Sequence, residues 1–116
     1  MDEKEIKVRL DLDFRFKDIK GKGESEKIWP AYEMAAEFLV RQASDSKEKR
    51  ARFFNWGLKL MDQKFIEVSK PDIESIMDAL NNTNIANLYF QQLNEVAEKA
   101  KDEWDELKKK AKEQKA

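Results

Sequence analysis

The sequence predicts a mainly helical α+β fold with a long N-terminal strand, a short second strand, three core helices and a long C-terminal helix. Three observations support this class: strict alternation near the N-terminus, amphipathic stretches of helical period, and a heptad-spaced apolar stripe in the last third. A chain of 116 residues is long enough to bury one modest core. We expect a single domain over residues 1–97 and a charged helical extension over residues 98–116.

The N-terminal strand is predicted from a pattern of period two. Apolar and charged residues alternate from Ile6 to Phe16, and no Gly or Pro interrupts them. Such alternation is typical of a half-buried strand. Eleven residues would span about 36 Å, roughly twice the usual strand length.

This strand has one visible partner, the short apolar segment at residues 64–68. Much of its edge would then be unpaired, and an unpaired edge pairs readily with another chain. We therefore predict association through the alternating strand, by the residues Leu10, Leu12, Phe14 and Phe16. The alternative is that only half of the segment forms a strand.

Three core helices follow from capping signals and periodicity. The first is predicted from Trp29 to Ala43, the second from Lys47 to Asp62, and the third from Ser69 to Asn81. Asp45 with Glu48, and Ser69 with Asp72, have the spacing of capping interactions. The expected buried side of the second helix consists of Phe53, Phe54, Gly57, Leu58, Leu60 and Met61.

The last helix is expected from Asn84 to about Gln114. Thirty-one residues would measure roughly 46 Å, whereas a compact domain of this size is roughly 35 Å across. Its last turns should therefore project or lie on another chain. Trp104 and Leu107 are predicted anchors for a protein partner. The alternative is that Trp104 covers the protein's own core.

Composition narrows the classes of function. The chain has 23 basic and 24 acidic residues, and its net charge of −1 provides no long-range attraction to nucleic acid or anionic membranes. It contains no Cys and no His, which removes the commonest metal ligands and the commonest general base. Without a signal-like N-terminus or a long apolar run, we expect a cytoplasmic protein. Charge-rich surfaces of this kind also indicate a thermophilic source.

Several local patterns could carry chemistry, but each has a simpler explanation. Asp11 and Asp13 share one strand face, where Arg9 and Arg15 would neutralise them. Residues 21–23 contain two glycines but lack the full spacing of a phosphate-binding loop. We interpret the first pattern as a solvated face and the second as a linker.

The start of the second helix combines basic and aromatic residues. Lys47, Lys49, Arg50 and Arg52 precede Phe53, Phe54 and Trp56. Basic and aromatic residues together can bind single-stranded nucleic acid. The aromatic residues, however, fall at core spacing. We therefore favour a helix with a buried aromatic side and a solvent-exposed basic side.

The order of motifs in the middle of the chain resembles that of small proteins of tailed bacteriophages and prophages. The similar stretches are residues 38–40, residues 47–60 (KEKRARFFNWGLKL), residues 66–68 (IEV) and residues 72–76 (DIESI). The resemblance covers residues 6–97, and the charged helix after Glu98 departs from it. It implies a role in virion or tail assembly and transfers no functional residues.

We therefore expect a non-enzymatic protein-binding protein of phage type, acting in assembly or as a chaperone-like factor. It would self-associate as a homo-oligomer and dock on protein partners, without cofactor, metal or small-molecule substrate. The alternative is a phage-encoded inhibitor or regulator that binds a host enzyme. Catalysis by two carboxylates would need only Asp and Glu, but no pair in the sequence is singled out.

Overall fold

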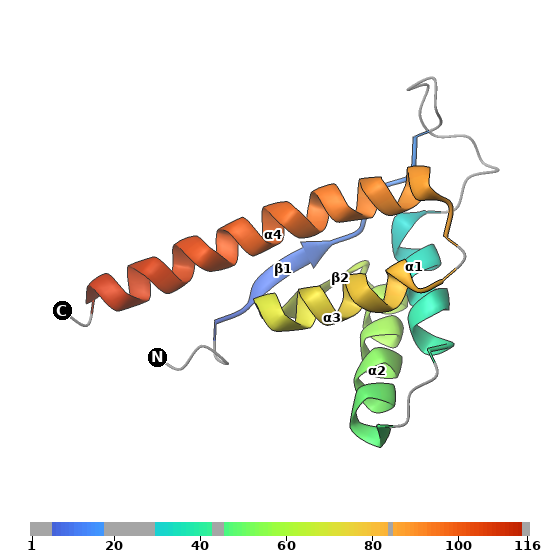
Figure 1. The fold of residues 1–116 in the computed structure, drawn as a ribbon, viewed down its shortest axis with the longest axis horizontal. Coiled ribbons are helices and arrows are strands. Elements are labelled where there is room, and N and C mark those ends of the chain that lie inside the picture. Colours follow the sequence, from blue (N-terminus) through green and yellow to red (C-terminus); the bar gives the residue numbers. More distant parts are fainter. Residues whose placement is uncertain (1–5, 18–29, 43–45, 84, 115–116) are drawn as a thin grey trace.

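The computed structural model describes residues 6–17, 30–42, 46–83 and 85–114. Within these residues the elements are β1 (Val8–Asp11), α1 (Ala31–Val40), α2 (Lys47–Gln63), β2 (Phe65–Val68), α3 (Lys70–Asn81) and α4 (Asn87–Gln114). The strands pair antiparallel, with Val8 opposite Val68 and Asp11 opposite Phe65. Helix α4 lies along β1, while α1 and α2 pack against each other (Figure 1). The predicted mainly helical α+β class is confirmed.

Strand β1 is shorter than the eleven residues predicted. The Asp11 side chain accepts a hydrogen bond from the Asp13 N–H at 2.9 Å, and the Phe14 N–H donates to the Leu12 carbonyl at 2.9 Å. The Leu12 N–H still donates to the Lys64 carbonyl at 3.0 Å, and the two local bonds turn the backbone out of the ladder after Leu12. Alternating burial nevertheless continues through the bend, since Leu12 and Phe16 are both buried. The prediction of one continuous strand was wrong because the same alternation fits both a ladder and this bent segment.

The bent segment after β1 supports the start of α1. The first N–H groups of a helix have no partner within the helix. Here the Ala31 N–H donates to the Phe14 carbonyl at 2.8 Å, and the Tyr32 N–H donates to the Leu12 carbonyl at 3.1 Å. Pro30 precedes the helix without a side-chain cap. The backbone of residues 12–14 therefore performs the capping role.

Two other helices begin with serine caps. Ser46 accepts the Lys49 N–H at the start of α2, whereas the predicted cap Asp45 lies outside the described residues. At α3 the predicted capping box is confirmed, because Ser69 and Asp72 bond each other's backbone N–H groups. Helix α2 ends at Gln63, and the next residue, Lys64, adopts a left-handed conformation with φ 67°. This left-handed residue reverses the helical path, so that β2 begins at the next residue, Phe65.

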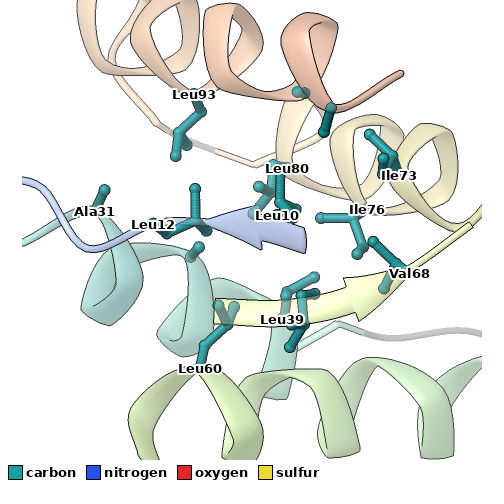
Figure 2. Close-up of a cluster of buried hydrophobic side chains, with 14 of the residues drawn as sticks. Leu10, Leu12, Ala31, Leu39, Leu60, Val68, Ile73, Ile76, Leu80 and Leu93 are labelled. Carbon is teal, nitrogen blue, oxygen red and sulfur yellow. The ribbon is translucent and has the colours of Figure 1, made fainter. Parts of the chain in front are cut away.

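The core lies on one face of the two-stranded sheet. Side chains from both strands and all four helices meet there, as Figure 2 shows for Leu10, Leu12, Leu39, Leu60, Val68, Ile73, Ile76, Leu80 and Leu93. The core extends beyond residue 97, because Ala100 and Trp104 are also buried. The expected domain boundary at residue 97 therefore falls within a helix that still contributes to the core.

Helix α4 holds the N-terminal segment at both ends. The Gln92 side chain accepts the Lys17 N–H at 2.8 Å and donates to the Lys17 carbonyl at 2.9 Å. At the other end, the Trp104 indole N–H donates to the Ile6 carbonyl at 2.9 Å. Lys70 at the start of α3 bonds Asp105 at 3.0 Å, and this hydrogen bond raises the pKa of Lys70.

The length of α4 makes the molecule elongated, as the sequence predicts. Its 28 residues correspond to about 42 Å. The radius of gyration is 15.1 Å, compared with about 13 Å for a compact domain of this size. The longest principal extent is 51 Å.

Gly57 allows α1 to approach α2 closely. A Cβ atom at this position would lie 2.6 Å from the Val40 Cγ1 atom and 3.2 Å from the Ala36 carbonyl oxygen. The first distance is below van der Waals contact and the second is tight. The helix pair therefore requires glycine here because of space.

We predict that Gly57→Ala destabilises the fold by about 1 kcal/mol. Overpacking against α1 costs about 1–3 kcal/mol and is partly offset by the better helix propensity of Ala. Urea unfolding followed by circular dichroism measures the change. Asn55→Ala, at an exposed position in the same helix, is the control and should not destabilise. A gain in stability for Gly57→Ala would contradict the close contact.

Candidate functional site

The strand residues predicted to mediate association lie inside the protein. Leu10, Leu12 and Phe16 are at most 2% exposed, and Phe14 is half-buried against the same core. The exposed face of β1 instead carries Lys7, Arg9 and Asp11 (all exposed). These side chains therefore do not form the predicted apolar contact, because the protein's own helices cover them.

The predicted C-terminal anchors are separated by the structure. Trp104 is 4% exposed, and its indole N–H is bonded to the Ile6 carbonyl. Leu107 is 43% exposed on the next turn of α4. The burial of Trp104 does not fit a free anchor and corresponds to the alternative in which it covers its own core.

The other sequence patterns are resolved by local contacts. Asp11 caps the turn at Asp13, and the Asp13 carboxylate lies 3.9 Å from the Lys64 ammonium group. Among the described residues, no cluster of three or more acidic side chains is placed to hold a metal ion. Residues 21–23 lie outside the described part of the chain.

The basic and aromatic residues of α2 do not all share one surface. Lys49, Arg52 and Trp56 line a shallow pocket of about 210 Å³ between α2 and α3, together with Asp78. Phe53 is buried at the base of that pocket, whereas Phe54 is half-exposed elsewhere on the helix. The set that could have stacked on nucleic-acid bases is therefore divided.

A different surface emerges from α2. Phe54, Leu58 and Met61 are 50%, 51% and 53% exposed. They recur at i, i+4 and i+7, so they share one side of the helix. Val40 at the end of α1 is 38% exposed and borders them, since it contacts Gly57. We call these four residues the α2 apolar surface.

This apolar surface was not expected, because Phe54, Leu58 and Met61 were predicted to share one buried side with Phe53, Gly57 and Leu60. The structure divides them into two stripes: Phe53, Gly57 and Leu60 face the core, whereas Phe54, Leu58 and Met61 do not. Each exposed residue directly follows a buried one, so at about 100° per residue the two stripes are centred roughly 100° apart. The sequence did contain a signal for this exposed stripe, because the apolar positions of α2 cover a wide arc. A helix at the edge of a small core buries a narrower stripe.

Charges frame the α2 apolar surface. Lys47 and Arg50 lie toward the N-terminal end of α2, and Asp62 follows Met61 at the other end. All three are exposed, and none of them forms an ion pair with another residue in the described part of the chain. Lys47 and Arg50 therefore flank one end of the surface and Asp62 flanks the other, although Glu48 also lies near the first end and Lys59 near the second.

Comparisons of the chain with protein-family models, curated proteins and solved structures find no match. The similarity to phage proteins thus stays a prediction from the order of sequence motifs. In the described part of the chain, no helix has both the length and the apolar character needed to cross a membrane.

The two stripes of α2 should differ sharply on truncation. Leu60→Ala should cost about 3 kcal/mol, because it leaves a cavity in the core. Leu58→Ala, only two residues away and half-exposed, should change stability by less than about 0.5 kcal/mol. Chemical denaturation of both variants measures the difference. Equal losses would show that the α2 apolar surface is part of the core.

A second pair of variants tests the position of Trp104. Trp104→Phe should cost about 1–2 kcal/mol, because the Ile6 carbonyl loses its hydrogen-bond donor and the smaller ring fills less space. Leu107→Ala should be within about 0.5 kcal/mol of the wild type. Thermal unfolding reports both values. An unchanged stability for Trp104→Phe would return this residue to the role of a free anchor.

Proposed function

We propose that this protein is a non-enzymatic protein-binding protein and that the α2 apolar surface is its contact. The observation that supports this most is the half-exposure of Phe54, Leu58 and Met61 on one side of a single helix. Scattered exposed apolar residues are common, but contiguous ones mark interaction surfaces. Anchors at i, i+4 and i+7 are the usual pattern by which a helix binds an apolar partner.

The distribution of exposed apolar side chains supports the choice of surface. In the described part of the chain, six large apolar side chains are exposed, and four of them form the α2 apolar surface. The other two, Leu88 and Leu107, lie on α4 and are 19 residues apart. Because no other cluster of comparable size exists among these residues, α2 is the better candidate than α4.

The setting we propose follows from the resemblance to phage proteins. In that setting the protein works in virion or tail assembly, or as a chaperone-like factor, by self-association and by docking on partners in the host cytoplasm. The alternative is a phage-encoded regulator that binds and inhibits a host enzyme. The identity of the bound protein distinguishes these two roles, because one predicts a structural protein and the other an enzyme.

Affinity capture with matched variants tests the proposed contact. We expect wild-type protein immobilised through its N-terminus to retain partners from cells that contain it. Leu58→Glu should abolish retention, because it places a charge in the apolar contact. Leu107→Glu, a matched change at an exposed leucine of α4, should leave retention unchanged. Bound proteins are identified and quantified by mass spectrometry, and each binding is repeated with purified components.

The variant that loses partner retention shows whether the contact lies on α2 or on α4. Loss with Leu107→Glu but not with Leu58→Glu would move the contact to α4, the helix that carries the anchors predicted from the sequence. Equal retention by wild type and both variants would contradict a specific apolar contact on either helix. Circular dichroism of each variant excludes unfolding as the cause of a loss.

A further inference from the structure

We infer that the α2 apolar surface binds a second copy of this chain, with the two α2 helices packed antiparallel about a two-fold axis that crosses the seam at the level of residue 56. The inference rests on the proposed function, because it assigns an occupant to the surface proposed above. Two features of the described residues support it, the spacing of the exposed apolar side chains and the charges at the two ends of α2. The apolar area then sets the expected strength.

The spacing matches a coiled-coil seam. Ala51, Phe54, Leu58 and Met61 are all exposed and are separated by three, four and three residues. This is the a–d–a–d order of a heptad repeat. The next d position toward the N-terminus is Lys47, the first residue of α2. At the other end the helix stops at Gln63, two residues after Met61. The seam is therefore complete within α2.

An antiparallel pair places each a residue opposite a d residue of the partner. Ala51 then lies opposite the partner's Met61, and Phe54 lies opposite the partner's Leu58. Both layers pair residues whose positions are symmetric about Trp56, so a single register uses all four side chains. A shift by one heptad would use only two of them. The small Ala51 also faces the long, flexible Met61, which favours even packing along the seam.

The end charges favour the antiparallel orientation. Lys47 continues the seam at its N-terminal end, and Asp62 borders it at the C-terminal end. Antiparallel packing brings Lys47 to the partner's Asp62 at both ends of the interface, and each basic helix start lies beside a helix C-terminus. Parallel packing would instead set Lys47 against its own copy. Glu48 occupies the same flanking heptad position as Asp62, so its carboxylate lies near the partner's Asp62 and offsets part of this electrostatic gain.

The apolar area sets the expected strength. The four side chains of the α2 apolar surface are 38% to 53% exposed, which corresponds to roughly 400 Å² per copy and lies within the range of about 300–600 Å² for the largest patch on a typical monomer. A standard interface buries about 800 Å² per partner. The flanks of the helix must supply the remainder, so we expect a dimer that forms reversibly and depends on concentration.

Cysteine cross-linking tests the pairing directly, because the chain contains no cysteine. Ala51→Cys and Met61→Cys are prepared separately, and each is oxidised alone and in an equimolar mixture at about 100 µM. We expect the mixture to form disulfide-linked dimers at least tenfold faster than either variant alone. Each residue is about 15 Å along the axis from its own copy in an antiparallel pair, which is beyond disulfide reach.

A matched control and a mass measurement complete the experiment. Lys59→Cys, exposed on another side of α2, should not cross-link with Met61→Cys. The average mass of the wild type, measured by light scattering, should rise with protein concentration from the 13.7 kDa of one chain toward twice that value. Leu58→Glu should stay at the mass of one chain over the same range.

Each other outcome overturns the inference. Rapid cross-linking of each single variant alone would show a parallel pair. A wild type that is monomeric at all concentrations, without cross-linking, would exclude the second copy, and retention lost with Leu58→Glu in the capture experiment would still support the proposed function. Binding to vesicles of anionic phospholipid that is lost in Leu58→Glu would assign the surface to a bilayer instead.

Discussion

The central position of residues 6–17 organises this fold. Their backbone pairs with β2, supplies carbonyl acceptors to the first turn of α1, and is held at its two ends by Gln92 and Trp104 of α4. Their alternating side chains fill the core from the middle. Because a two-stranded sheet has little stability alone, the strand and the surrounding helices depend on one another. The N-terminal segment thus joins elements that are distant in sequence.

This arrangement explains why α2 retains an exposed apolar side. The core is closed by the sheet face and by stripes from α1, α3 and α4, so α2 contributes only Phe53, Gly57 and Leu60 as fully buried positions. Gly57 draws α1 against one side of α2 and leaves Val40 at the border of the exposed side. Nothing else in the described part of the chain covers Phe54, Leu58 and Met61. Their exposure follows from the small size of the core rather than from a loosely packed helix.

Local signals in the sequence were sufficient for much of the fold. The Ser69–Asp72 capping box, the amphipathic α3 and the length of α4 all depend on residues close together in the chain, and the structure agrees with them. The bend after Leu12 depends on how side-chain and backbone groups compete for hydrogen bonds, which alternation does not encode. The role of Trp104 depends on the position of Ile6, 98 residues away. The exposure of Leu58 likewise depends on which helices reach α2, so the wide apolar arc of α2 indicates that some apolar positions are exposed but not which ones.

The separation of the two stripes on α2 also has a consequence for how binding and stability are related. Leu60 is wholly buried and Leu58 is half-exposed, although they are neighbours on one helix. Core residues hold α2 in place, so the backbone that carries Phe54, Leu58 and Met61 is ordered before any partner arrives. A preordered helix loses less conformational entropy on binding than a segment that folds on its partner. A small apolar area can then support a specific contact, because most of the cost of ordering has already been met by folding.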